Sequence, residues 1–117
     1  MKLKLLIVED NPAVRRIIRG IVAALADDIF ECEDGVGALA AYHAHRPDFV
    51  LMDVAMNGLD GIAATRQIRA TDPDAKVIIV TNYDEADLRE AARAAGACDY
   101  VLKEDLLTLR QLLRMAS

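Results

Sequence analysis

Residues 3–12 read LKLLIVEDNP, and this stretch holds one complete change from strand to helix. Leu3–Val8 is nearly continuous in apolar residues, which is typical of a strand buried on both faces of a parallel sheet. Asn11 is a good helix N-cap, and Pro12 suits the first helical position. An apolar stripe at helical spacing then continues to Leu25. The chain is therefore expected to begin with one β-strand and one α-helix.

The same change recurs four times further along the chain. The expected strands cover residues 29–33, 48–53, 76–81 and 100–102, and the helical stripes that follow them cover 36–43, 62–70, 88–95 and 104–115. Pro47 ends the second of the five helices, and Gly96 is well placed just after the fourth. Strands that alternate with helices over short connections indicate a parallel sheet with helices on both faces. We predict an α/β fold, a single doubly wound (βα)5 domain over residues 1–117.

Composition narrows the class of protein. The chain has 117 residues, of which 54% are hydrophobic, 28% are charged and none is Trp, so one domain with an aliphatic core is expected. A net charge of −5 argues against a module whose whole surface binds nucleic acid or an anionic membrane. The first apolar run is too short to span a membrane, and Glu9 follows it at once. We expect a cytoplasmic protein in which Cys32 and Cys98 are buried free thiols.

Polar residues stand at the carboxyl ends of the expected strands. Glu9 and Asp10 follow the first strand, Asp53 ends the third, Thr81 ends the fourth, and Lys103 follows the fifth. In doubly wound sheets, ligands bind beyond these ends, where the strand order reverses. If the first and third strands are neighbours, three carboxylates converge and repel one another, which favours bound Mg²⁺. A hydroxyl at Thr81 and an ammonium at Lys103 suit a phosphoryl group, so the set is equipped for phosphorylation of a carboxylate.

This order of residues resembles the receiver domains of two-component response regulators, over essentially the whole chain. The resemblance includes Met56 and Gly61 in the loop after the third strand and Tyr100 three residues before Lys103. It implies the CheY-like, flavodoxin-like sheet with strand order 2-1-3-4-5. Residues 77–113 are most similar to receivers of the NarL/FixJ/LuxR-type regulators, which precede a DNA-binding helix-turn-helix. We expect no output domain within residues 1–117.

The resemblance also assigns a phosphoacceptor and a metal site. Asp53 would accept a phosphoryl group from the histidine of a sensor kinase or from a phosphotransfer protein. Asp10, Asp53 and the backbone carbonyl of Ala55 would bind Mg²⁺, and Glu9 would act through water. Such a domain is a phosphoacceptor switch rather than a conventional enzyme, because it catalyses only its own phosphorylation and dephosphorylation.

Further roles concern the phosphoryl group and the switch. Thr81 and Lys103 would hold the phosphoryl oxygens, and Tyr100 would turn inward as Thr81 moves. The residues that would tune hydrolysis of the acyl phosphate are Ala55, Asn82 and Tyr83. Two positions depart from the family's pattern, because Asn57 stands where Pro is common and Asn82 where a very small residue is usual. Phosphorylation would change a protein-interaction surface, produce a homodimer and control transcription through an effector outside this chain, which itself would contact neither DNA nor membrane.

Three other functions stay open from the residues alone. A stand-alone or phosphorylation-independent receiver would serve only as a protein-interaction module. A phosphatase with an Asp nucleophile would carry a DxDx[TV] run at its first strand, where this chain has Glu9 and Asp10. A nucleotide-binding flavodoxin-like protein would need a glycine-rich loop after a strand, and the run Gly35-Val36-Gly37 is too short.

Overall fold

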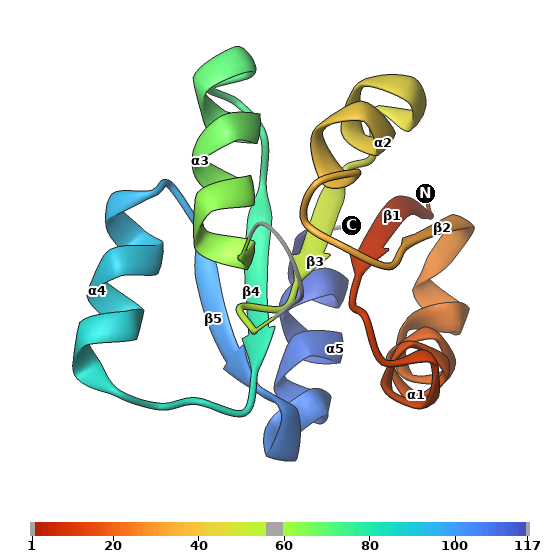
Figure 1. The fold of residues 1–117 in the computed structure, drawn as a ribbon. Helices are drawn as coiled ribbons and strands as arrows, with labels where there is room; N and C mark the ends of the chain where they lie inside the picture. The colour runs from red at the N-terminus through yellow and green to blue at the C-terminus, as the bar shows by residue number, and fades with distance from the viewer. Residues whose placement is uncertain (1, 56–59, 117) are drawn as a thin grey trace.

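The computed structural model describes residues 2–55 and 60–116, and these form five strands and five α-helices (Figure 1). The strands are β1 (Leu3–Val8), β2 (Ala26–Cys32), β3 (Phe49–Met52), β4 (Val77–Thr81) and β5 (Asp99–Leu102). The α-helices are α1 (Pro12–Val22), α2 (Ala38–His45), α3 (Gly61–Thr71), α4 (Ala86–Ala94) and α5 (Leu106–Ala116). All strand pairs are parallel, in the order β2-β1-β3-β4-β5. The predicted fold class and strand order are confirmed.

Helices cover both faces of the sheet, which explains why the central strands are apolar throughout. In β1, Leu5 and Ile7 pack in one buried cluster with residues of α1 and α5. Leu6 and Val8 point to the opposite face and pack with residues of α2, α3 and α4. Because successive side chains of a strand alternate between faces, both sets must be hydrophobic when both faces are covered.

The ends of two helices confirm the turn chemistry read from the sequence. Asn11 caps α1, since its Oδ1 accepts hydrogen bonds from the backbone N–H groups of Ala13 at 2.9 Å and Val14 at 3.4 Å. Pro12 occupies the first turn of the same helix. Gly96 follows α4 with φ of 104°, a backbone conformation that favours glycine.

The structure corrects two expected elements on the β2 side of the sheet. The second strand was expected from residue 29, but β2 begins at Ala26, because it pairs with β1 from Leu3 onward. The second helical stripe was expected to include Val36, which is 68% exposed. Helix α2 begins only at Ala38, after a turn in which Asp34 Oδ1 accepts from the Gly37 N–H at 2.8 Å. Its buried residues are therefore Ala38 and Tyr42.

Two further expectations need correction. Cys32 and Cys98 are free thiols as predicted, but Cys98 is exposed and Cys32 is only half-buried. Both lie on the edge strands or their connections, where one side of the sheet has no neighbouring strand. The last helix was expected from residue 104, whereas Lys103–Asp105 form a 3-10 turn and α5 starts at Leu106.

Within residues 2–55 and 60–116, no helix is both long and apolar enough to cross a membrane.

Candidate functional site

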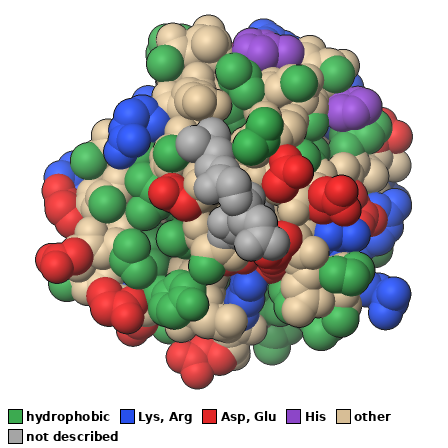
Figure 2. Space-filling model, in the orientation of Figure 1, with side chains coloured by type: hydrophobic (Ala, Val, Ile, Leu, Met, Phe, Trp, Pro, Cys, Tyr) green, Lys and Arg blue, Asp and Glu red, His purple; other side chains and the backbone are tan. Residues whose placement is uncertain are grey.

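Three carboxylates meet at the carboxyl ends of β1 and β3. The two strands are neighbours, with Val8 opposite Met52, so the residues that follow them leave the sheet side by side. One carboxylate oxygen from each of Glu9, Asp10 and Asp53 lies within 4.8 Å of the others. The cleft around them has a volume of about 220 Å³. Figure 2 shows several Asp and Glu side chains near the middle of the face turned toward the viewer.

Lys103 places a single ammonium in this cluster. It follows β5, and its Nζ lies 2.6 Å from Glu9 Oε1 and 3.4 Å from Asp53 Oδ2. Glu9 is 1% exposed and Asp53 is 5% exposed, so these charges interact with little screening by water. One ammonium balances only one of three carboxylates. The site therefore retains an excess of negative charge that a bound cation would neutralise.

Hydrogen bonds with the backbone hold Glu9 in place, and burial shifts the pKa of its carboxyl group. The N–H of Glu9 donates to the carbonyl of Cys32 at 3.0 Å, and its Oε2 accepts from the N–H of Asn11 at 3.1 Å. Burial raises the pKa of Glu9 above its usual value, although the hydrogen bonds from Lys103 and Asn11 oppose the shift. Burial alone would lower the pKa of Lys103, but the contact with Glu9 and the charge of Asp53 outweigh it and raise that pKa.

The donor set fits a hard divalent cation. Carboxylate oxygens that lie close together with surplus negative charge are the usual protein ligands of Mg²⁺, which keeps several waters as well. Glu9, Asp10 and Asp53 could hold such an ion, and Ala55 lines the same cleft. Opposite them, Lys103 offers a positive charge to an anionic group. The arrangement suits a cation and a phosphoryl group bound side by side.

Most of the predicted site residues come together in this cleft. Those that line it are Glu9, Asp10, Asp53, Ala55, Asn82, Tyr83 and Lys103. Asn11 and Val14 line it too and were not predicted to do so, although the helix start at Pro12 places them beside the acidic pair. Met56 and Asn57 lie outside the described residues.

Thr81 lies behind the cleft wall. It is fully buried at the end of β4, and its Oγ1 accepts a hydrogen bond from the N–H of Tyr83 at 3.4 Å. Tyr83 in turn accepts, through its backbone carbonyl, a hydrogen bond of 2.6 Å from the hydroxyl of Tyr100. A continuous set of contacts therefore leads from Thr81 through the main chain of Tyr83 to Tyr100.

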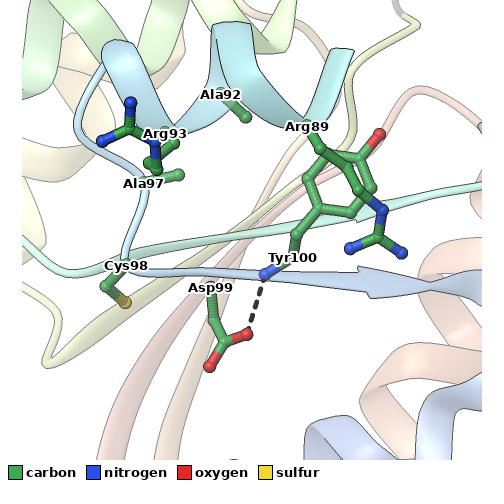
Figure 3. A pocket seen from close by; sticks show the side chains of 7 residues that line it. All are labelled: Arg89, Ala92, Arg93, Ala97, Cys98, Asp99 and Tyr100. Atoms are coloured by element: carbon green, nitrogen blue, oxygen red, sulfur yellow. Dashed lines mark hydrogen bonds between the residues drawn. The ribbon is translucent and has the colours of Figure 1, made fainter. Parts of the chain in front are cut away.

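Tyr100 lines a different pocket, between α4 and β5 (Figure 3). The guanidinium of Arg89 lies over the Tyr100 ring, 4.5 Å from its centroid, and also pairs with Asp84 at 2.6 Å. The pocket has a volume of about 240 Å³, and its lining includes Ala92 and Ala97. Asp99 is its single acidic lining residue. It lacks the converging carboxylates of the cleft and is therefore not a candidate cation site.

Comparisons with known proteins cover nearly the whole chain. Residues 5–114 match the family model described as the response regulator receiver domain. "Response regulator MprA" of Mycobacterium sp. (strain KMS) is 37% identical over 122 residues, which covers 100% of this chain and 53% of that protein. "Response regulator MprA" of Mycobacterium tuberculosis (strain ATCC 25177 / H37Ra) is 36% identical over 119 residues, covering 97% and 52%. The chain thus spans about half the length of these relatives.

Solved structures give the same assignment. A two-component response regulator of the LuxR family from Aurantimonas sp. SI85-9A1 superposes with a TM-score of 0.93 at 31% identity, covering 99% of this chain and 85% of that one. The CheX-CheY-BeF3-Mg complex from Borrelia burgdorferi gives a TM-score of 0.88 at 26% identity, covering 97% and 87%. LuxR-family regulators are among the similar solved structures, as the resemblance read from residues 77–113 predicts. The chain belongs to the family of response regulator receiver domains of two-component signalling.

Proposed function

We propose that Asp53 is the phosphoacceptor of this receiver domain and takes its phosphoryl group from a phosphohistidine of a sensor histidine kinase or a phosphotransfer protein. The observation that carries the proposal is the cluster of Glu9, Asp10 and Asp53 with Lys103 between two of them. A carboxylate oxygen of Asp53 bonds to phosphorus as the bond from phosphorus to the imidazole nitrogen breaks. The electron pair of the broken bond stays on that nitrogen.

The metal assignment rests on the same cleft. We assign direct Mg²⁺ ligation to Asp10, Asp53 and the backbone carbonyl of Ala55, with Glu9 acting through water. The closeness of the three carboxylates and the position of Ala55 in the cleft lining support this set. When bound, Mg²⁺ supplies positive charge that stabilises the phosphoryl oxygens.

Lys103 and Thr81 are our candidates for holding those oxygens. The Nζ of Lys103 already lies 3.4 Å from Asp53 Oδ2, so the ammonium can interact with the oxygens of a phosphoryl group on Asp53. The hydroxyl of Thr81 currently accepts from Tyr83, and it would turn to donate to a phosphoryl oxygen. This rotation of the hydroxyl weakens the hydrogen bond that it accepts from the Tyr83 N–H. The carbonyl of Tyr83 accepts the hydrogen bond from the Tyr100 hydroxyl, so the change reaches Tyr100. Thr81 and Tyr100 thereby form the switch from the cleft to the α4–β5 surface.

Three residues at the cleft are placed to tune the lifetime of the acyl phosphate. Ala55, Asn82 and Tyr83 all line the cleft, and all three are exposed to solvent. Side chains here decide whether water can approach the phosphorus atom opposite the Asp53 oxygen. Asn82, larger than the family's usual residue, also narrows access for the phosphodonor, which supports a phosphorylation-independent interaction module as the second candidate function.

The wider role follows from the relatives. They are about twice as long as this chain, so we propose that residues 1–117 act as the receiver of a regulator whose effector controls transcription. Phosphorylation would alter the surface around α4 and β5 and favour a homodimer, while the receiver itself contacts neither DNA nor membrane. The domain acts as a switch that catalyses only its own phosphorylation and dephosphorylation. The free thiols of Cys32 and Cys98 fit a reducing compartment, and we assign the domain to the cytoplasm.

Intact-mass spectrometry after incubation with Mg²⁺ and acetyl phosphate tests the proposal. The wild type should gain about 80 Da, the mass of one phosphoryl group. Asp53→Asn should gain nothing, whereas Asp28→Asn, which changes an exposed acid of β2, should behave like the wild type. An adduct that persists in Asp53→Asn would overturn the assignment. No adduct from acetyl phosphate or from a histidine kinase would favour the interaction module, and continuous release of phosphate from unrelated esters would favour a phosphatase.

A further inference from the structure

We infer that Arg15 is a positioning residue for the acidic site, because its guanidinium fixes the peptide group that joins Glu9 to Asp10. The inference rests on the proposed function of the cleft as a cation and phosphoryl site. Arg15 lies in α1, outside the strand ends that mark the site in the sequence. Its Nη1 donates to the backbone carbonyl of Glu9 at 2.7 Å, and its side chain is 17% exposed.

The carbonyl of Glu9 needs a donor that the sheet does not supply. Pairing of β1 with β2 ends at Val8 opposite Cys32. The N–H of Glu9 still donates to the carbonyl of Cys32, at 3.0 Å, but there the ladder stops. Arg15 supplies the next hydrogen bond, from a side chain. Both peptide groups that flank the Glu9 α-carbon are then held, and this fixes the directions in which the Glu9 and Asp10 side chains leave the backbone.

Arg15 is itself held at a second point, so its position is defined before any ligand binds. Its Nε donates to Glu31 Oε1 of β2 at 2.9 Å. The other carboxylate oxygen of Glu31 accepts from Arg19 Nη1 at 2.6 Å. A planar guanidinium with donors in two fixed directions can bridge a carbonyl and a carboxylate in this way, and a lysine ammonium cannot reproduce that geometry. The acidic loop is therefore tied to the edge strand through one side chain.

Charge and position predict opposite effects of Arg15 on cation binding. A positive charge near Glu9, Asp10 and Asp53 repels Mg²⁺, so its removal should tighten binding if charge alone mattered. A positioning residue has the reverse effect, because its removal lets the Glu9–Asp10 peptide reorient and disperses the ligands. Groups that orient metal ligands through hydrogen bonds typically change metal affinity by about 10-fold to 100-fold. The sign of the change in affinity separates the two roles.

The test is calorimetric titration with Mg²⁺ of the wild type, Arg15→Met and Arg16→Met. Arg16 is exposed on the same helix and, among the described residues, makes no hydrogen bond or ion pair. Arg16→Met is therefore the control, because it removes the same charge as Arg15→Met without removing a contact. We expect Arg15→Met to bind Mg²⁺ roughly 10-fold more weakly. Arg16→Met should bind as the wild type does, or slightly more tightly. Arg15→Lys, which keeps the charge, should weaken binding about as much as Arg15→Met.

A thermal melt of each variant without Mg²⁺ checks that it folds. If Arg15→Met fails to fold, Glu31→Gln gives a second route, because it removes the charged anchor of Arg15 at an exposed position and should weaken Mg²⁺ binding to a smaller extent. A folded Arg15→Met or Arg15→Lys that binds Mg²⁺ as tightly as the wild type overturns the inference. A wild type that binds no Mg²⁺ counts instead against the proposed function, so the two failures are distinguishable.

Discussion

The α-carbon of Gly61 packs directly against the main chain of Asp53: a Cβ at Gly61 would lie 1.8 Å from the Asp53 carbonyl oxygen. The N–H of Gly61 also donates to the carbonyl of Val54 at 3.0 Å. The first turn of α3 thus rests on the segment that carries the acidic residue of β3. Only glycine allows this close approach, so the position of Asp53 depends on a residue that bears no functional group.

Substitution of Gly61 by Ala should therefore disturb both stability and chemistry. The new methyl group forces the Asp53 main chain or the start of α3 to move, and crowding of this kind costs about 1 to 3 kcal/mol. Urea unfolding should report that loss. The yield of the acetyl phosphate adduct should fall as well, because the Asp53 carboxylate moves with its backbone.

Gly20→Ala is the matched control. Gly20 lies in the interior of α1, and a Cβ there would meet nothing within 4 Å. This variant should be more stable than the wild type by about 0.5 to 1 kcal/mol, since alanine favours a helix over glycine. Its adduct yield should not change. A Gly61→Ala protein as stable and as reactive as Gly20→Ala would contradict the contact between α3 and Asp53.

Removal of the Lys103 ammonium should make the domain depend on Mg²⁺ for stability. Lys103→Met leaves Glu9 and Asp53 buried without their counter-charge, and loss of one partner from such a pair costs about 3 to 5 kcal/mol. A divalent cation can replace the missing charge, so the melting temperature of the variant should rise more with added Mg²⁺ than that of the wild type. Its acyl phosphate yield should fall, because no ammonium faces the phosphoryl group.

Lys76→Met controls for the loss of a lysine charge. Lys76 precedes β4 at the opposite end of the strand from Thr81, and its Nζ lies 5.4 Å from the centroid of the Phe49 ring. This contact is worth about 0.5 to 1 kcal/mol. The variant should respond to Mg²⁺ as the wild type does. Equal Mg²⁺ responses of the Lys103 and Lys76 variants would contradict the role assigned to Lys103.

Much of the site could be predicted because its residues are marked by local signals. Asp53 and Thr81 end or follow strands that are apolar throughout, and the rule for doubly wound sheets brings such strand ends together. The bounds of β2 and α2 were harder to predict. Strand β2 (ADDIFEC) is only partly buried and lacks clear alternation, so its start at Ala26 left little mark in the sequence. In α2, a run of alanines gives almost no contrast between the two faces of the helix.

Contacts from side chains to main-chain carbonyls were beyond prediction from sequence, unlike the Asn11 cap at the start of α1. Arg15 reaches back to the Glu9 carbonyl, and Tyr100 reaches the Tyr83 carbonyl from another strand. Every residue has a carbonyl, so no residue type identifies which one will accept the bond. The path of the folded chain decides which carbonyl lies within reach of the side chain. The same holds for Thr81, whose type and position were predicted but whose present partner, the Tyr83 N–H, was not.

Alkaline pH should weaken the packing of α2 against the end of α3. Burial, with the hydrogen bond to Asp72, raises the pKa of Tyr42 to about 12. The hydroxyl donates to Asp72 Oδ2 at 2.6 Å, and the ring is 4% exposed. Because the pKa is higher in the folded state, the resulting stability is complete below pH 10 and is lost between about pH 10 and 12. A shift of this size corresponds to roughly 2 to 3 kcal/mol.

Tyr42→Phe should remove this pH dependence. Urea unfolding at several pH values from neutral to alkaline should show the wild type losing more stability than the variant across that window. At acid pH the sign is opposite. The Tyr42 hydroxyl holds the pKa of Asp72 below its usual value, so the wild type should lose this stabilisation as pH falls through that lowered pKa. Parallel stability curves for the two proteins would contradict the coupling.

The lifetime of the acyl phosphate should depend on the ring of Tyr83. The side chain lines the cleft and is 45% exposed, and its main chain is held by Thr81 on one side and Tyr100 on the other. This places the ring where it can restrict the approach of water to phosphorus. Tyr83→Ala should therefore lose its phosphoryl group several-fold faster than the wild type, as followed by the decay of the mass adduct. Tyr83→Phe keeps the ring and should decay at the wild-type rate, whereas Tyr100→Phe removes the bond to the Tyr83 carbonyl and should give an intermediate rate. An unchanged lifetime in Tyr83→Ala would refute the shielding role.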